Sequence, residues 1–499
     1  MNVTYTAALS GLESQLVHVE VRKTRGTPQL ILIGLAGKTI VESRERIRSA
    51  LTSCNIRIPA SRIVINLAPA DIPKVGSHYE LAICAALLIA LRKSKVKLDT
   101  TLFLGELSLD GSIRPIRGAL AMVTGLIDSR ITTVIVPKGN FAELSLLTSV
   151  SIHPIEHVSE LIDFMYESAP LPNQTQKLSQ NDIHNRVDTL GEIHGQENAK
   201  RALEIAAAGG HNVLMTGPPG SGKSMLAKAL PEILPPLTIE ESVQVTAIHS
   251  LCGLTQDGFL RERPFRSPHH ATSRNGLLGG HVPIRPGELS LAHRGVLFLD
   301  ELPEFSRDCL ESLRQPLEDG QISIVRAQET VVFPAQCSLI AAANPCPCGY
   351  FGTSNKICNC TPTQIQQYKK KLSGPLLDRF DLHIYLQPVK VAQLLEKKHS
   401  FSAQNIQKRV LIARKIQHHR YASSVITNAT ASSSALQLYC ALDKKSQSFL
   451  AAAVEKLHLS ARNYYRVLRV SRTIADLHES TSITQAHVAE SLQFRQQYS

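Results

Sequence analysis

The sequence predicts an α/β protein in three parts: a parallel sheet with crossover helices in the middle, a compact α+β domain before it and helices after it. Between about residues 190 and 392, strand-like apolar runs alternate with helix-compatible stretches, as in parallel sheets. A similar alternation fills residues 1–167, and the pattern after residue 392 is helical. With 499 residues the chain is long enough for about two to four domains.

The first 167 residues combine short strands with helices. The apolar runs Ile63–Leu67 and Thr133–Val136 read as strands, and the stretches Val41–Leu51 and Tyr79–Leu91 read as helices. The most apolar run, Leu81–Leu91, is well below the roughly 20 residues that span a bilayer. Because the N-terminus also lacks the pattern of a signal peptide, we expect a cytoplasmic protein with no membrane partner and with reduced cysteines.

A polar segment separates this domain from the middle of the chain. Ser168–His184 contains two Pro, three Gln and two Asn without apolar periodicity, which predicts a linker over residues 168–189. The middle domain is then expected over 190–392 and a helical domain over 393–499. The last of these contains long helical stretches at Ala403–His419 and Arg462–Leu477, interrupted by the Ser- and Thr-rich segment Tyr421–Ala435.

A phosphate-binding loop follows the first strand of the middle domain. The residues that fit G-x-x-x-x-G-K-[ST] are Gly217, Pro218, Pro219, Gly220, Ser221, Gly222, Lys223 and Ser224. They follow the apolar run Asn212–Thr216 and precede the helix-compatible Met225–Leu230, which is the context that such a loop requires. Backbone N–H groups and the helix dipole would bind phosphate oxygens. Lys223 would reach the β- and γ-phosphates of ATP, and the Ser224 hydroxyl would coordinate Mg²⁺.

Polar residues also end two later strands. Gly295–Leu299 is apolar and is followed by Asp300 and Glu301. We expect Asp300 to hold Mg²⁺ and Glu301 to orient or activate the attacking water. The strand Ser338–Ala343 ends at Asn344, whose amide can contact the γ-phosphate or that water.

Two arginines near the end of the module suit phosphoryl transfer. Arg379 follows a helix end, and Arg462 lies in a helical stretch. Each alone is usually a surface charge, but beside a phosphate loop both can stabilise transition-state charge.

Four of the ten cysteines lie close together as two C-x-C pairs: Cys346, Cys348, Cys358 and Cys360. Four thiolates can form the tetrahedral set that structural Zn²⁺ favours, and free thiols in a loop are the alternative. The adjacent His269 and His270 make a poor chelating pair, since neighbouring side chains point in different directions; we expect structural or pore-loop roles.

The positive charge is concentrated in the final third. Residues 351–499 carry 21 Lys and Arg against 8 Asp and Glu, whereas residues 1–350 carry 33 against 34. Such a segment can attract nucleic acid, and a solvated basic face is the alternative. Arg462, Arg466, Arg469 and Arg472 repeat at helical spacing and predict a solvated or DNA-facing stripe.

Together these stretches resemble the magnesium-chelatase-like AAA+ ATPases, specifically the bacterial ComM/YifB group, nearly from end to end. The most specific segments are 263–270, 286–305, 344–349, 373–381 and 472–477. The resemblance implies a Walker A motif at 217–224, a Walker B motif at Asp300 and Glu301, and sensor 1 at Asn344. It also implies sensor 2 at Arg462, a C-terminal lid, and a homo-hexamer in which Arg379 completes the site of a neighbouring subunit.

The same resemblance implies a DNA motor. Two pore insertions would fall near Ala247–Arg266 and Gln321–Pro334, the second as a β-hairpin. Their pore-facing basic residues would be Arg261, Arg263, Arg266 and Arg326. The implied function is ATP-driven branch migration on single-stranded and branched DNA in natural transformation, beside recombination proteins.

The N-terminal 167 residues resemble the Lon-protease-like domain of this family, which needs a Ser–Lys dyad for proteolysis. Ser77 sits one place early, His78 takes the expected position, and Pro115–Ala121 has no lysine where the base is expected. We therefore predict a non-proteolytic domain, which excludes an ATP-dependent protease. A chelatase-type ATPase that remodels a partner protein remains the alternative function, and the basic final third and the fused N-terminal domain disfavour it.

Overall fold

The computed structural model describes residues 3–35, 37–92, 94, 96–127, 129–167, 169–172, 188–255, 258–281, 283–326, 329–353, 356–388, 402–457 and 459–495. Most of the predicted linker, and the predicted boundary at residue 392, lie outside these ranges. Within them, no helix is long and apolar enough to cross a membrane.

The N-terminal region is built on a seven-stranded mixed sheet in the order β3-β4-β2-β1-β5-β8-β9. Its strands are β1 (Val3–Ser10), β2 (Glu13–Thr24), β3 (Gln29–Ile33), β4 (Arg62–Ala68), β5 (Thr101–Phe103), β8 (Thr133–Pro137) and β9 (Ser151–Ile155). A short hairpin joins β6 (Glu106–Leu107) to β7 (Ile113–Arg114). The helices are α1 (Lys38–Ser53), α2 (Glu80–Leu91), α3 (Ala119–Thr124), α4 (Lys138–Leu144) and α5 (Val158–Ile162), with a π-helical turn at Asp163–Glu167. The predicted strands and helices of this region are confirmed.

The apolar run that the sequence marks as too short for a membrane is the buried helix α2. Its residues Glu80–Leu88 are all buried, because the helix packs between the sheet and α1. Burial on all sides explains why the sequence there shows no amphipathic pattern.

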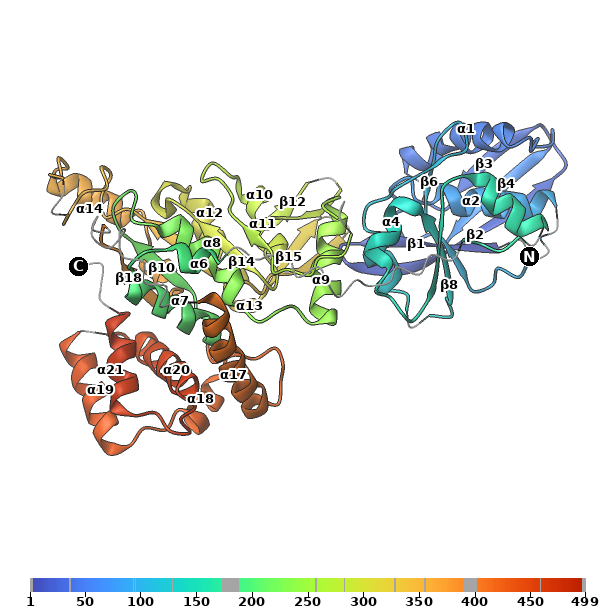
Figure 1. Cartoon of the computed structure of the whole chain (residues 1–499). Coiled ribbons are helices and arrows are strands. Elements are labelled where there is room, and N and C mark those ends of the chain that lie inside the picture. The colour runs from blue at the N-terminus through green and yellow to red at the C-terminus, as the bar shows by residue number, and fades with distance from the viewer. Residues whose placement is uncertain are drawn as a thin grey trace.

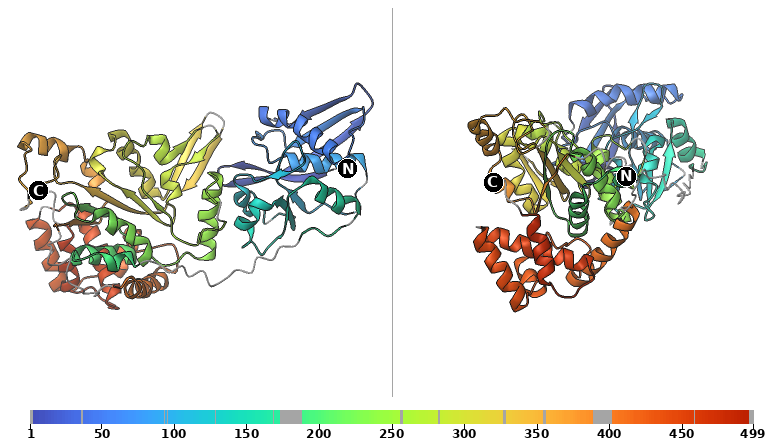
Figure 2. Two further views of the ribbon diagram at one scale, coloured as in Figure 1. Left: turned by 45° about the horizontal axis from the view of Figure 1, so that its top comes forward. Right: turned by 60° about the vertical axis from the view of Figure 1, so that its left-hand side comes forward.

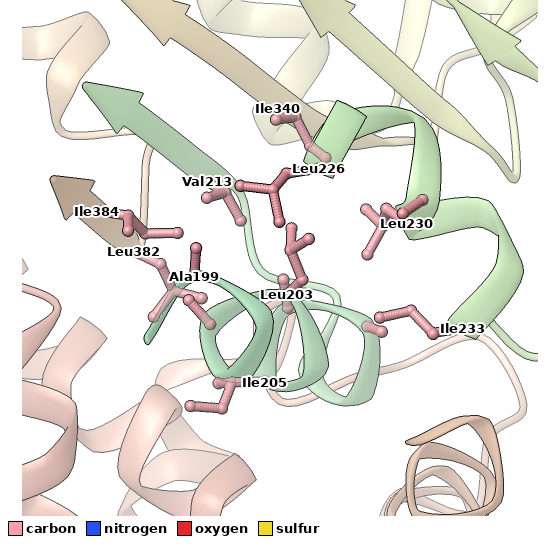
Figure 3. Close-up of a cluster of buried hydrophobic side chains, with 14 of the residues drawn as sticks. Ala199, Leu203, Ile205, Val213, Leu226, Leu230, Ile233, Ile340, Leu382 and Ile384 are labelled. Carbon is pink, nitrogen blue, oxygen red and sulfur yellow. The ribbon is translucent and has the colours of Figure 1, made fainter. Parts of the chain in front are cut away.

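The central region contains a five-stranded parallel sheet in the order β11-β14-β17-β10-β18. The strands are β11 (Phe265–Arg266), β14 (Val296–Leu299), β17 (Ser338–Ala343), β10 (Val213–Thr216) and β18 (Leu382–Tyr385). Side chains of α7 (Glu197–Gly209) and α8 (Lys223–Ile233) meet those of β10, β17 and β18 in one buried cluster (Figure 3). The predicted parallel sheet with crossover helices is confirmed.

Shorter elements surround this sheet. They are α6 (Thr189–Glu192), α9 (Ile239–Leu251), α10 (Arg274–Leu278), β12 (Gly279–Gly280), β13 (Arg285–Pro286), α11 (Glu288–Leu291), the 3₁₀ turn Leu302–Glu304, α12 (Arg307–Ser312), α13 (Arg314–Asp319), α14 (Pro362–Lys370) and α15 (Gly374–Leu377). The predicted β-hairpin also forms, from β15 (Gln321–Arg326) and β16 (Glu329–Pro334).

The C-terminal region is a group of helices that lies below the central region in Figure 1. Its members are α17 (Ala403–Tyr421), α18 (Ser433–Tyr439), α19 (Lys444–Lys456), α20 (Ala461–Leu477) and α21 (Gln485–Gln493). Helix α20 packs against α7, α17 and α21 and so joins the two regions.

Two of the four arginines in the predicted stripe on α20 are buried, so most of the stripe is not a solvated surface. Arg466 is 9% exposed and Arg472 only 1%. Arg472 donates to the Asp476 carboxylate and to the Thr481 carbonyl oxygen, so its charge and hydrogen-bonding groups are satisfied internally. The helical spacing is confirmed, but where α20 packs against other helices Arg466 and Arg472 point inward, each with a partner.

The N-terminal region joins the central region through α9 and the hairpin (Figures 1 and 2). The Gly118 N–H donates to the Ser250 carbonyl oxygen at 3.1 Å, and the Thr255 hydroxyl donates to Glu143 at 3.1 Å. Ala247 belongs to the apolar cluster of the N-terminal region. The end of α9 and the chain that follows it, predicted as a pore insertion, therefore form a docking surface for the N-terminal region.

Candidate nucleotide site

The phosphate loop joins β10 to α8, and the N–H groups at the start of α8 are available for a ligand. Gly220 and Gly222 have φ of +75° and +90°, a backbone conformation that glycine adopts without strain. A Cβ at either position would meet no atom within 4 Å, so both glycines face open space. No side chain caps the N-terminus of α8. Its first N–H groups and dipole are therefore available to an anion, and the loop fits the phosphates of ATP.

Lys223 and Asn344 meet where the carboxyl ends of β10 and β17 lie side by side. The Lys223 Nζ donates to the carbonyl oxygens of Gly217 at 2.7 Å and Pro218 at 2.9 Å, and to Asn344 Oδ1 at 3.2 Å. Burial lowers the pKa of the lysine ammonium, and the carboxylates of Asp300 and Glu301 act in the opposite direction. Lys223, predicted from the Walker A motif, and Asn344, predicted as sensor 1, therefore lie in the same site.

Ser224 and Asp300 provide the predicted magnesium ligands. Ser224 Oγ donates to Asp300 Oδ2 at 3.0 Å, and Asp300 Oδ1 accepts the Glu301 N–H at 2.9 Å. Adjacent oxygens around an octahedral Mg²⁺ with bonds of about 2.05 Å lie about 2.9 Å apart. A hydroxyl and a carboxylate oxygen at this separation fit the ion well.

Glu301 adopts a backbone conformation that is rare for its residue type. Its φ is +50°, and strained backbone of this kind concentrates at functional sites. Its Oε2 lies 3.4 Å from His270 Nδ1, and the His270 ring lies against the ring of His269, with centroids 4.0 Å apart and planes tilted by 35°. We expected a structural or pore-loop role for His270. The structure instead places it beside Glu301, the predicted catalytic carboxylate. No sequence pattern indicated this contact, which arises because β11 pairs with β14.

The two arginines of the predicted site are Arg379, which follows α15, and Arg462, which lies in the first turn of α20. Arg379 Nη2 pairs with Glu318 Oε1 at 2.6 Å, and the Arg379 side chain is only 11% exposed. Burial lowers the Arg379 pKa and Glu318 raises it; Arg466, Arg462 and Arg314 also lower it. Arg462 is exposed at the start of α20. Among the described interactions, neither Arg379 nor Arg462 contacts the phosphate loop of this chain.

The four predicted DNA-facing arginines fall into two groups. Arg263 donates to the Arg294 carbonyl oxygen at 2.5 Å and pairs with Glu241 at 3.1 Å. Arg266 forms two parallel bonds with Glu288, at 2.6 and 2.7 Å. Both arginines form ion pairs with carboxylates of the same chain, so we no longer propose them as DNA contacts. Arg261 and Arg326 are exposed, Arg326 at the end of the hairpin strand β15, and stay predictions.

The four predicted cysteines do come together. Their sulfur atoms all lie within 4.8 Å of one another, with Cys346 to Cys348 at 3.3 Å and Cys346 to Cys358 at 3.7 Å. Zn–S bonds of about 2.3 Å place the sulfurs of a tetrahedron about 3.8 Å apart. The Phe351 N–H donates to Cys346 Sγ at 3.3 Å, which suits a thiolate. The sulfur set, with Cys360 as its fourth member, fits Zn²⁺.

One residue near the loop carried no sequence signal. Gln196 donates from Nε2 to the carbonyl oxygens of Ser221 at 3.2 Å and Gln387 at 2.7 Å. It thereby ties the phosphate loop to the chain that leaves β18. A lone glutamine before a helix gives no pattern from which this could be predicted.

The N-terminal region lacks a visible dyad at the predicted position. Ser77 Oγ donates to the Glu106 carboxylate instead of a lysine amine. His78 is buried, which lowers its pKa to about 4, and its Nε2 contacts the Ala7 carbonyl oxygen at 2.9 Å. Neither residue is placed as a Ser–Lys pair requires, so the prediction of a non-proteolytic domain stands as a prediction.

Comparison with known proteins covers nearly the whole chain. The family model "Magnesium chelatase, subunit ChlI" matches residues 189–394, "Subunit ChlI of Mg-chelatase" matches 19–140, and "Magnesium chelatase, subunit ChlI C-terminal" matches 400–495. The chain is 41% identical to "Competence protein ComM" of Haemophilus influenzae, over 99% of this chain and 97% of that protein. It is 40% identical to "Uncharacterized protein YifB" of Escherichia coli, over 99% and 97%. A shorter match, 28% identical over 38% of this chain and 20% of the other, is to "DNA replication licensing factor Mcm2" of Drosophila melanogaster.

Proposed function

Because the chain belongs to the ComM/YifB group of the magnesium-chelatase-like AAA+ family, we propose that it is an ATP-driven motor that moves on DNA. The observation that carries the proposal is the constellation of Lys223, Ser224, Asp300 and Asn344 at one edge of the parallel sheet. These are the groups that bind a nucleoside triphosphate and its metal ion in P-loop enzymes.

Each residue of the constellation has a distinct task. The loop N–H groups hold the phosphates, and Lys223 exchanges its bonds to Gly217 and Pro218 for phosphate oxygens. Ser224 and Asp300 hold Mg²⁺, which when bound neutralises developing charge on the phosphates. Glu301 accepts a hydrogen bond from the attacking water and takes its proton, and the Asn344 amide orients that water.

Arg379 acts between subunits in this proposal. It does not contact the phosphate loop of its own chain, and Arg314 and Arg462 add positive charge around it. In a homo-hexamer Arg379 would face the nucleotide of the neighbour, Arg462 would act as sensor 2, and both would stabilise the charge on the transferred phosphoryl group. Arg379 would then exchange Glu318 for phosphate.

DNA is the proposed substrate for three reasons. One full-length relative is named a competence protein, and a partial relative is named a DNA replication factor. The final third of the chain has an excess of positive charge. The hairpin presents Arg326 at its exposed end. We propose that the protein binds single-stranded and branched DNA and drives branch migration during natural transformation, in cooperation with recombination proteins.

The remaining parts support the motor. The N-terminal region would be a non-proteolytic Lon-like domain, docked on α9. The C-terminal helices would form the lid of the ATPase module. A structural Zn²⁺ on the four cysteines would brace the chain between Asn344, which follows β17, and α14.

The test is ATP-dependent resolution of a labelled synthetic four-way DNA junction, run beside Lys223→Ala. We expect resolution by the wild type and none by the variant. No resolution by either protein, with ATPase activity indifferent to DNA, would favour a chelatase-type ATPase that remodels a partner protein.

A further inference from the structure

The segment Arg379–Asp381, called here the finger segment, is fastened to the C-terminal helices by buried polar contacts. Asp381 is 7% exposed, and its carboxylate lies 3.1 Å from His211 Nδ1 and 3.7 Å from Arg466 Nη1. The neighbouring Phe380 carbonyl oxygen accepts a hydrogen bond from Arg466 Nη1 at 3.0 Å. Arg466, on α20, therefore contacts both residues that follow Arg379.

The same network reaches the base of the strand that leads to the phosphate loop. His211 is fully buried two residues before β10, and its Nε2 contacts Thr473 Oγ1 on α20 at 2.8 Å. The adjacent Asn212 donates from its side chain to the Arg379 carbonyl oxygen at 3.1 Å. Helix α20, the start of β10 and the finger segment are thus joined through side chains at one point.

The Asp381 carboxylate of this network stays ionised at neutral pH, because its pKa is low. Burial alone would raise the pKa of Asp381, but the hydrogen bond from His211 and the charges of Arg466 and Arg495 hold it at about 2. A buried ion pair adds little net stability over apolar residues of the same size, so stability alone gives no reason for it. Such a pair does fix geometry, since each partner is costly to separate.

We propose that Arg466 and Asp381 are positioning residues that tie the finger segment to helix α20, so that the orientation of the C-terminal helices sets how Arg379 is presented to the neighbouring subunit. The inference rests on the proposed role of Arg379 in the neighbour's site. The nucleotide held by one subunit would then influence hydrolysis in the next, because α20 contacts both the finger segment and His211, which leads into the phosphate-loop strand.

The test uses mixed rings in which the altered subunits cannot bind ATP but still offer their finger to a neighbour. Wild-type chain is mixed with Lys223→Ala chain that carries a second change, and the ATPase rate per wild-type subunit is measured. We expect Arg466→Met and Asp381→Asn, each in the Lys223→Ala background, to lower this rate by about ten-fold relative to Lys223→Ala alone. Arg379→Ala in the same background should lower it further, since a finger arginine can contribute about 10³-fold or more.

Arg469→Met is the matched control. Arg469 lies one turn further along α20, and its Nη2 donates to the Ala431 carbonyl oxygen within the C-terminal region. In the Lys223→Ala background, Arg469→Met should give the same ATPase rate per wild-type subunit as Lys223→Ala alone. Singly altered Arg466→Met chain should keep its affinity for fluorescent ATP within the range of Arg469→Met. If Arg466→Met fails to fold, Asp381→Asn tests the same contact with a side chain of nearly the same size.

Two results would overturn the inference, and they differ in meaning. If Arg379→Ala subunits slow their wild-type neighbours and both Arg466→Met and Asp381→Asn subunits do not, the positioning role is wrong while the role of Arg379 survives. If Arg379→Ala subunits have no effect on their neighbours beyond that of Lys223→Ala, the role of Arg379 between subunits is wrong and the inference falls with it.

Discussion

His270 Nδ1 lies 3.4 Å from Glu301 Oε2, so the carboxylate predicted to activate water has a protein partner in the structure. Both side chains are partly exposed, at 36% and 53%. A contact between exposed groups is weak and can be exchanged for water or substrate at small cost. The pair therefore suits a carboxylate that changes partners as the nucleotide site is filled.

We expect His270→Ala to raise ATPase activity without DNA by no more than about five-fold, because a contact between two partly exposed side chains contributes at most about 1 kcal/mol. Without the imidazole, the Glu301 carboxylate would spend a larger fraction of time available to the attacking water. Steady-state hydrolysis without DNA measures this, with His269→Ala as the control that leaves the Glu301 contact intact. A fall in the rate for His270→Ala alone would mean that the imidazole assists Glu301.

Two substitutions separate nucleotide binding from hydrolysis. Lys223→Ala should impair ATP binding, because its ammonium is the cation that the loop directs at the phosphates. Glu301→Gln should bind ATP and stall hydrolysis, since an amide cannot take the proton from water. Binding of fluorescent ATP, measured beside single-turnover hydrolysis, distinguishes the two. Normal turnover by Glu301→Gln would remove this residue from the catalytic role.

The phosphate loop and its partners could be predicted from sequence because their chemistry is local. A strand that ends in a fixed glycine pattern, or in two carboxylates, needs few residues and little tertiary context. Lys223, Asp300 and Asn344 follow three neighbouring parallel strands, so their meeting follows from the sheet. The four cysteines were found in the same way, from spacing alone.

Contacts between elements distant in sequence could not be predicted. Arg466 looked solvated because helical spacing shows which residues share a face but not what covers that face. For the same reason, the sequence could not show that His270 lies beside Glu301 or that Glu318 lies beside Arg379. Arg263 and Arg266 looked available for DNA because their partners Glu241 and Glu288 lie 22 residues away in sequence.

Asp381 should make stability depend on pH in the acid range. Its folded pKa of about 2 lies below the ordinary value of 3.8, so its contribution is present above pH 4 and is lost as the pH falls toward 2. We expect Asp381→Asn to lower the free energy of unfolding by about 2 kcal/mol at pH 7 and by about half as much at pH 3. Urea unfolding of both proteins at the two pH values measures this. An equal loss at both would assign the effect to packing instead of charge.

The four cysteines should bind about one Zn²⁺ per chain. Elemental analysis of protein purified under reducing conditions measures the metal, and Cys348→Ser or Cys358→Ser should lose it. Cys440→Ser is the control, because Cys440 is buried in the C-terminal region, away from the cluster. We also expect a chelator to lower the melting temperature of the wild type more than that of Cys358→Ser. Absence of zinc from the reduced wild type would leave free thiols as the better interpretation.

Arg379 pairs with Glu318, and the two can be changed separately. Arg379→Ala should keep ATP binding and lose hydrolysis by about 10³-fold in the assembled ring, because a finger arginine acts on the transition state. Glu318→Gln should stay within about five-fold of the wild type, since it removes only a half-exposed partner. Binding and turnover are measured over a range of protein concentrations, and wild-type subunits should partly rescue Arg379→Ala in mixed rings. Loss of ATP binding by Arg379→Ala would instead place this arginine in its own subunit's site.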